Sequence, residues 1–266
     1  MRTTSNPAFR NLPAGGYAGF GSAPAGLAGH SGYVGAPATT ERPMTVDDVV
    51  TKTGITLAVL VAAAAATWIS DQWWLALPAA LVGFVLAMVV IFKKQVSPPL
   101  ILAYAAVEGV FLGGISAIFQ QFAESNFAES NIVLNAVVGT AAVFGGMLVV
   151  YKTGAVRVTP RFQKWMMGAL IGVVGLMLVN LLARVFGFGD GAGLGLREPT
   201  ALGIGFSLLC IGVAAFSFLM DFDAADKAIR AGAPEKFAWY TAFGLTVTLV
   251  WLYLEMLRLL SYFQGD

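Results

Sequence analysis

Residues 238–263 read AWYTAFGLTVTLVWLYLEMLRLLSYF, and this stretch decides the class of fold. A helix of about 20 apolar residues is long enough to cross a bilayer, and this segment carries only two charged residues, Glu255 and Arg258. Ionisable side chains inside a span are costly and usually face a bundle interior or a wet cavity. The segment is therefore predicted to be a membrane span whose acidic face meets other helices or water.

Six more apolar segments precede this one, and together they predict an all-α integral membrane protein with seven transmembrane helices. Only 12% of the chain is charged, whereas a soluble domain has about 25% charged residues. Two small-residue motifs, Gly109-x-x-x-Gly113 and Gly168-x-x-x-Gly172, are expected to let helices pack closely within the chain. The expected spans are residues 54–70, 73–92, 99–122, 132–151, 165–186, 200–222 and 238–263.

The N-terminal region has a different composition. Gly, Ala and Pro dominate residues 1–43, without any hydrophobic period. Such a segment cannot bury enough apolar surface to offset its chain entropy. We expect a disordered cytoplasmic tail over residues 1–43, followed by a transmembrane domain over residues 44–266.

The basic residues predict the orientation of the chain in the membrane. Cytoplasmic loops carry an excess of Lys and Arg. By this rule the N-terminus is cytoplasmic and, after seven spans, the C-terminus is outside. Of the 16 Lys and Arg residues, 13 would lie on the side of the N-terminus: Arg2, Arg10, Arg42, Lys52, Lys93, Lys94, Lys152, Arg157, Arg161, Lys164, Lys227, Arg230 and Lys236.

Glu108 is expected near the middle of the bilayer. It follows the start of its span by about nine residues, each of which advances a helix by about 1.5 Å. No Lys or Arg lies within one helical turn of it, so its carboxyl group should be protonated at neutral pH. Glu108 either lines an ion path or is a neutral acid that is hydrogen-bonded to a neighbouring helix.

Other acids mark the sixth and seventh spans. Asp221, Asp223 and Asp226 lie in FLMDFDAADKAIRAG, where acids at a helix end commonly face water. Asp221 still belongs to the apolar run, so it is the one that can point inward. Glu255 has Arg258 at i+3 on the same helix face, so it either lines an ion path or forms a local ion pair.

The sequence argues against an enzyme and against a nucleic-acid partner. The chain has one Cys, Cys210 in an apolar run, and one His, His30 in the tail. No Ser/His, His/Glu or Cys/His set exists within the spans, so we expect no intramembrane catalysis, no cofactor and no fixed metal site. A net charge of +1 does not supply the basic face that a nucleic acid needs.

Three segments resemble the Bax inhibitor-1 family of transmembrane proteins, which has bacterial members. They are YAAVEGVFLGGIS (104–116), FSFLMDFD (216–223) and GLTVTLVWLYLEMLRLL (244–260). The Gly-rich tail looks like the actinobacterial branch of that family. The resemblance implies a last helix that is surrounded by the first six. It also implies a pH-sensitive calcium leak gated by two aspartates, one ending helix six and one within helix seven.

By this resemblance, Asp221 matches the first aspartate, and Glu108 matches the acid of a Glu-Gly step in helix three. Glu255 matches the second aspartate if WLYLE is aligned with Leu-Tyr-Leu-Asp, whereas Thr248 matches it if the chain ends are aligned without a gap. Helix geometry favours Thr248, because Glu255 would lie about 15 Å further along the axis than the residue opposite Asp221. Asp221, Glu108 and Glu255 would then form a ladder along helix seven.

We therefore expect a pH-sensitive calcium (cation) leak channel of the bacterial cytoplasmic membrane. Its transported or regulatory ions would be calcium and protons. Its partner would be membrane lipid, and a membrane protein or protease stays open as a further partner. One alternative is a non-transporting regulator that binds other membrane proteins or a membrane protease. Another is a proton-coupled transporter, although the sequence lacks the mid-span helix breaks that such proteins use. The residues expected to form the ion path and the pH sensor are Asp221, Glu108, Glu255, Thr248 and Asp223.

Overall fold

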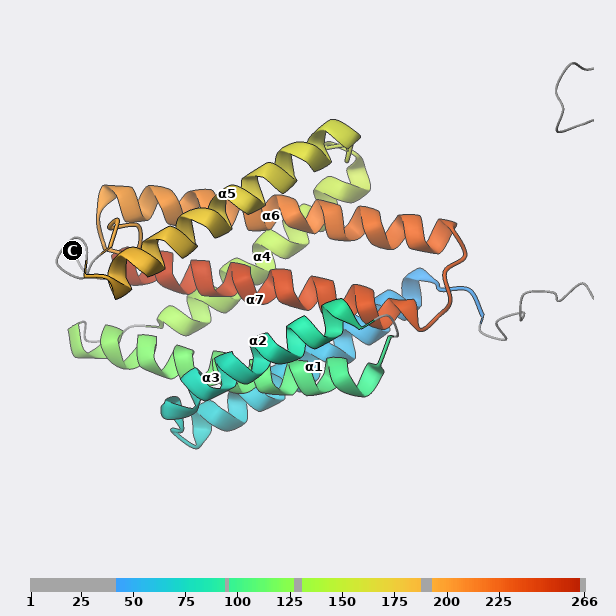
Figure 1. Cartoon of the computed structure of the whole chain (residues 1–266). Coiled ribbons are helices and arrows are strands. Elements are labelled where there is room, and N and C mark those ends of the chain that lie inside the picture. Colours follow the sequence, from blue (N-terminus) through green and yellow to red (C-terminus); the bar gives the residue numbers. More distant parts are fainter. Residues whose placement is uncertain (1–41, 94–95, 127–130, 188–192, 264–266) are drawn as a thin grey trace, which may run out of the picture. The chain divides into compact units, whose positions relative to one another are not determined.

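The computed structural model describes residues 42–93, 96–126, 131–187 and 193–263, which form seven long helices and one short 3-10 helix (Figure 1). The disorder expected for the tail falls on residues 1–41, which lie outside the described residues. In chain order the elements are α1 (Val46–Ile69), η2 (Trp73–Leu75), α2 (Ala76–Phe92), α3 (Pro98–Asn126), α4 (Ile132–Thr153), α5 (Pro160–Val185), α6 (Ala201–Arg230) and α7 (Phe237–Phe263).

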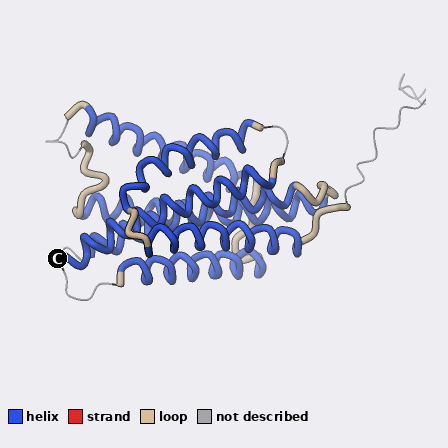
Figure 2. Tube along the Cα trace, turned by 90° about the horizontal axis from the view of Figure 1, so that it is seen from below, coloured by secondary structure: helices blue, strands red, loops and turns tan. Residues whose placement is uncertain are grey.

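All seven long helices are long and apolar enough to cross a membrane. This confirms the predicted class, an all-α multi-pass membrane protein. The seven-helix body is elongated along its helices in both ribbon views (Figure 2). Its surface carries large exposed apolar side chains such as Leu77, Phe84 and Ile171, as a surface in contact with lipid requires.

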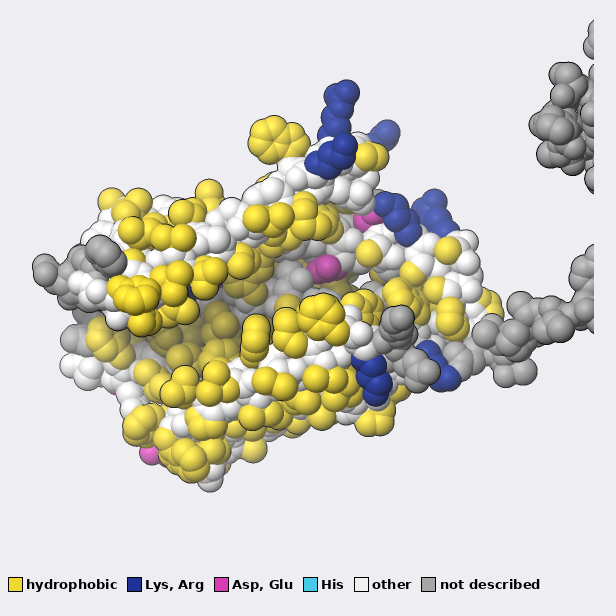
Figure 3. Space-filling view, in the orientation of Figure 1, with side chains coloured by type: hydrophobic (Ala, Val, Ile, Leu, Met, Phe, Trp, Pro, Cys, Tyr) yellow, Lys and Arg dark blue, Asp and Glu magenta, His cyan; other side chains and the backbone are white. Residues whose placement is uncertain are grey.

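The two ends of the bundle differ in charge. Lys and Arg side chains gather towards the end where the chain passes from α4 to α5 and from α6 to α7 (Figure 3). The rest of the same face is mostly apolar. We call this end, which includes residues 154–159 and 231–236, the basic end.

α1 begins at Val46 rather than at residue 54, where the apolar run starts. The reason is a capping box: the Thr45 side chain accepts a hydrogen bond from the backbone of Asp48, and the Asp48 side chain accepts one from the backbone of Thr45. These contacts satisfy donors that a helix start otherwise leaves unpaired. The first turns of α1 are therefore polar and were missed by a hydrophobicity-based prediction.

α6 likewise continues to Arg230, beyond the predicted end of the span at residue 222. Ion pairs one turn apart, Asp223 with Lys227 and Asp226 with Arg230, lie along this extension. Such i,i+4 pairs stabilise an exposed helix. Asp221 is consequently inside α6 and not at its end.

α7 is the central helix of the bundle, as predicted. It packs along α1, α3, α4 and α6, and Figure 1 shows it between α6 on one side and α1 to α3 on the other. Its buried side chains join separate apolar clusters: Leu257 packs with α1, α3 and α4 residues, whereas Leu252 packs with α4 and α6 residues. Any shift of α7 must therefore repack most of the interior.

One of the two small-residue motifs makes the expected contact within the chain. A Cβ on Gly109 or Gly113 would collide with the backbone oxygen of Leu60 or Ala64 on α1, so the glycines are what allow α1 and α3 to approach. The prediction was wrong for Gly168-x-x-x-Gly172. No described atom of another element lies within 4 Å of a Cβ built on either residue, because α5 packs mainly along α6.

The chain just before α1 is fastened to the turn between α6 and α7. Met44 N donates to Ala233 O at 2.8 Å and Glu235 N donates to Arg42 O at 3.0 Å. Side chains continue the contact, because Arg42 Nε lies 3.2 Å from Glu235 Oε2 and Lys52 Nζ lies 2.9 Å from Glu235 Oε1. We call the contact of residues 42–52 with residues 233–235 the clasp. Residue 43, where the predicted tail ends, lies within it.

Candidate functional site

Asp221 and Thr248 face each other across α6 and α7. The two helices are joined by a short turn in which Gly232 has a φ of +67°, a conformation that suits glycine. Thr248 Oγ1 donates to Asp221 Oδ2 at 2.7 Å, and Gly244 O is a second acceptor at 3.2 Å. The structure thus brings together the pair that helix geometry favours.

The surroundings of this pair are apolar. Thr248 is buried and Asp221 is half-buried, and Phe218, Phe222 and Leu245 of the same two helices belong to one hydrophobic cluster. Within the described residues, no Lys or Arg forms an ion pair with Asp221. A carboxylate with a hydroxyl partner and no basic partner has oxygen lone pairs free to take a proton or a cation such as calcium.

Asp223 and Asp226 are placed differently from Asp221. Asp223 pairs with Lys227 and also accepts a hydrogen bond from Gln163 of α5 at 3.4 Å. Asp226 pairs with Arg230 at 2.8 Å. Both carboxylates are neutralised by a basic residue of their own helix, towards the basic end.

Glu108 lies on α3 and reaches across to α2. A Cβ built on Gly83 would stand 2.7 Å from Glu108 Oε2, so the missing side chain of Gly83 provides the room for this carboxyl group. Glu108 is half-buried, and no hydrogen bond or ion pair connects it to another of the described residues. Gly83 was not singled out in the sequence, although a count of residues on either side of the connection between α2 and α3 would have placed it at the level of Glu108.

Glu255 is the most buried of these acids, at 1% exposure. Its Oε1 lies 3.1 Å from Arg197 Nη1 and 3.0 Å from Arg258 Nη1. Its Oε2 is buried and accepts no hydrogen bond from the described residues. Two guanidinium groups thus share one carboxylate, which leaves an excess positive charge.

Arg197 was not predicted as a partner of Glu255. It lies in the turns that precede α6, far from Glu255 in sequence, and its guanidinium also stands 6.0 Å from the ring of Phe206. Arg258, by contrast, follows from the i+3 spacing. The one available signal for Arg197 is that it is a rare basic residue on its side of the membrane.

The expected ladder of acids does not form as one continuous row. Thr248 and Glu255 lie on one face of α7, about 10 Å apart along the axis, but the fully buried Leu252 and Phe218 pack between these two levels. Glu108 is directed towards α2. No three His, Cys, Asp or Glu side chains within the described ranges are close enough to hold one metal ion together.

Comparison with known proteins places this bundle in a family. No curated protein matches the chain. A family profile described as Bax inhibitor 1 like matches residues 6–265, which include all seven helices and the carboxylates of α3, α6 and α7. Since that match takes in nearly the whole sequence, the chain belongs to the Bax inhibitor 1 like family of membrane proteins.

Proposed function

We propose that the protein is a pH-sensitive leak channel for calcium, or for cations more generally. The observation that carries this proposal is Asp221, a half-buried carboxylate on a membrane-spanning helix with a threonine hydroxyl as partner and no basic partner among the described residues. Oxygen ligands of this kind suit calcium. A proton that binds the same oxygens removes the charge that attracts the cation, so flux is expected to rise with pH.

The order of the residues along the path follows from the orientation of the chain. We propose that the protein lies in the bacterial cytoplasmic membrane, with the basic end and the N-terminus in the cytoplasm, because Lys and Arg are retained on that side. In this orientation Asp221 and Thr248 lie nearer the cytoplasm than Glu255 does. A cation that leaves Asp221 outwards must pass Leu252 and Phe218, which are fully buried. Conduction therefore requires α6 and α7 to separate at this level.

The test is calcium uptake into vesicles that contain the pure full-length protein and a calcium-sensitive dye, measured across a pH series. Flux is expected in the wild type, with a rise as pH increases. Asp221→Asn should lower the flux and remove its pH dependence. Asp226→Asn, which changes an acid of the same helix that is paired with Arg230, is the matched control. Absence of flux in the wild type, or an unaltered pH profile in Asp221→Asn, would contradict the proposal.

One observation favours a second function, a non-transporting regulator that binds another membrane protein. The Gly168 and Gly172 face of α5 has open space above it, and small residues of this kind let a neighbouring helix approach closely. If the protein is such a regulator, the vesicles should show no calcium flux. A membrane protein should then co-purify with the wild type but not with Gly168→Leu.

A further inference from the structure

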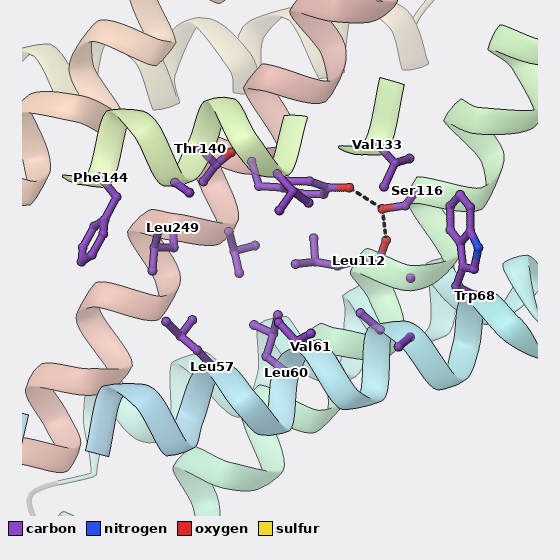
Figure 4. Close-up of a pocket in the computed structure, with 17 residues that line it drawn as sticks. Leu57, Leu60, Val61, Trp68, Leu112, Ser116, Val133, Thr140, Phe144 and Leu249 are labelled. Carbon is purple, nitrogen blue, oxygen red and sulfur yellow. Dashed lines mark hydrogen bonds between the residues drawn. The ribbon is translucent and has the colours of Figure 1, made fainter. Parts of the chain in front are cut away.

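A cavity of about 570 Å³ lies between α1 and α4, with α7 and α3 as its floor. Figure 4 shows the side chains of Leu57, Leu60 and Val61 on one side and those of Thr140 and Phe144 on the other, facing the same space. Small residues of the two walls, among them Ala65 and Ala141, leave it open. We call it the α1–α4 groove.

The lining of the groove provides neither a charge nor a free hydrogen-bond donor for a polar ligand. It contains no charged residue from the described part of the chain. Its hydroxyl groups already donate hydrogen bonds: Ser116 Oγ donates to Leu112 O at 2.6 Å and lies 2.7 Å from Tyr253 OH, whose proton is then directed at Ser116. Thr140 donates to Ala136 O at 2.7 Å. An occupant of the groove is therefore apolar.

The groove opens towards the bilayer. α1 and α4 both pack on α7, but hardly on each other, so the space between them is not closed by a helix. Val61 and Val137, which line the groove, are 61% and 49% exposed. In a membrane-spanning bundle, apolar side chains at such a mouth meet hydrocarbon and not water.

The length of the groove matches one leaflet. On α1 it is lined from Leu57 to Trp68 and on α4 from Val133 to Phe144. Either stretch is about 16 Å long, about half of the hydrocarbon thickness of about 30 Å. Trp68 is at the last turn of α1, where an indole suits the membrane interface. The groove thus lies in the leaflet opposite the basic end.

We propose that the α1–α4 groove binds one acyl chain of a bilayer lipid from that leaflet. The proposal does not depend on ion conduction. Three properties of the groove favour an acyl chain. Its lining is apolar and its hydroxyl groups already donate hydrogen bonds within the protein. It is as long as one leaflet and opens sideways towards the lipid.

The test uses full-length protein in phosphatidylcholine vesicles that contain a phosphatidylcholine with a photoactivatable diazirine in its acyl chain. After illumination, mass spectrometry should find lipid attached to the segments 57–68 and 133–144. Attachment should saturate at one lipid per chain as the labelled lipid is increased, whereas lipid that merely surrounds the protein gives labelling that keeps rising.

Two double variants on the same helices provide the comparison. A65F/A141F places two rings in the groove and should reduce labelling of these segments several-fold. A66F/A142F makes the same change at neighbouring residues that are exposed but do not line the groove, and should label like the wild type. The wild-type saturation curve decides the matter independently of how either variant folds.

The proposal would be overturned by any of the following outcomes. The first is labelling of the two segments that does not saturate in the wild type. The second is equal labelling in A65F/A141F and A66F/A142F. The third is a wild-type groove that is labelled by a diazirine fatty acid but not by the phospholipid, or that is cross-linked to a second copy of the chain in its place.

Discussion

Thr248 lies opposite Asp221, and an alignment of the chain ends without a gap matches it to the second aspartate that the resemblance implies. An aspartate placed at this position tests that match. In Thr248→Asp, two carboxyl groups would stand within hydrogen-bonding distance, since the present oxygens are 2.7 Å apart. Two carboxylates so close cannot both ionise readily and share a proton. The flux-versus-pH curve is therefore expected to shift upwards by about one pH unit or more.

Two further variants control this prediction. Asp221→Asn in the Thr248→Asp background should abolish the shift, because only one carboxyl group remains. Thr248→Val keeps the shape of the side chain but adds no second carboxyl group, so it should not produce this shift of the flux-versus-pH curve. If Glu255→Gln moves the curve in the wild type while Thr248→Asp does not, the functional partner of Asp221 is Glu255.

Glu108 can be tested through the glycine that it contacts. In Gly83→Ala the new methyl group would stand 2.7 Å from Glu108 Oε2, so the carboxyl group must move while the backbone can stay. If Glu108 lines the path, Gly83→Ala and Glu108→Gln should each change calcium flux several-fold with little change in the unfolding temperature.

Gly145→Ala is the matched control, because no described atom of another element lies within 4 Å of the added Cβ. Normal flux in both Gly83→Ala and Glu108→Gln at every pH would mean that Glu108 is a packing residue.

The charges around Glu255 predict an unequal response to mutation. Glu255→Gln leaves Arg197 and Arg258 together without a carboxylate, and breaking a buried ion pair in this way costs about 3–5 kcal/mol. Arg197→Gln leaves the pair with Arg258 intact and should cost less. Unfolding of the two variants in detergent, followed by denaturant, gives the comparison. If Arg197→Gln lowers the free energy of unfolding more than Glu255→Gln does, the main role of Glu255 is not to balance the two positive charges.

Some contacts of the acidic residues could be predicted from the sequence and others could not. The pairing of Glu255 with Arg258 follows from spacing along one helix, and that of Asp221 with Thr248 follows from counting residues on either side of a turn. The contact of Gly83 with Glu108 joins α2 and α3, which are also consecutive helices with a short connection, so the same count of residues could have found it. Arg197 lies in the turns that precede α6 and reaches Glu255 on α7. No local pattern records that contact, so only the packed structure reveals it.

At the scale of elements, the clasp predicts how far the N-terminus can be shortened. A protein that begins at residue 40 keeps Arg42 and Met44 and should melt at the same temperature as the full chain. A protein that begins at residue 45 loses the hydrogen bonds and the ion pair that Arg42 and Met44 make with residues 233–235, although Lys52 keeps its ion pair with Glu235, and it should melt a few degrees lower. Thermal unfolding in detergent measures both.

Glu235→Gln in the full-length chain is the matched point variant for this prediction. It weakens the ion pairs with Arg42 and Lys52 without removing any residue of the tail. Equal melting temperatures for the chains that begin at residues 40 and 45 would show that the clasp does not hold α1 to the turn between α6 and α7.

The predicted spans were right in number, and their ends were wrong where polar contacts extend a helix. A hydrophobic run identifies only the part of a helix that lies in the hydrocarbon of the bilayer. The capping box before α1 and the ion pairs at the end of α6 lie outside that part. The helices are therefore longer than their apolar runs. Polar residue spacing at the ends, read together with hydropathy, would have improved both boundaries.

At the scale of the whole molecule, the class of fold was predictable because seven apolar runs permit little else. The central place of the last helix came from the resemblance and agrees with the packing of α7. The small contact area of α5 was not predictable, since its sequence is as apolar as that of the buried helices. Apolar side chains do not distinguish a neighbouring helix from lipid.

α7 leaves the ribosome after α1, α3, α4 and α6, although all four pack on it. Synthesis proceeds from the N-terminus, so the earlier helices enter the bilayer before their shared partner exists. Until α7 is inserted, the helix faces that will pack on it contact lipid or one another. Asp221 lies on one of these faces. Assembly of the bundle thus waits for α7: a nascent chain that stops before residue 237 has inserted α1 to α6 but lacks the helix on which four of them pack.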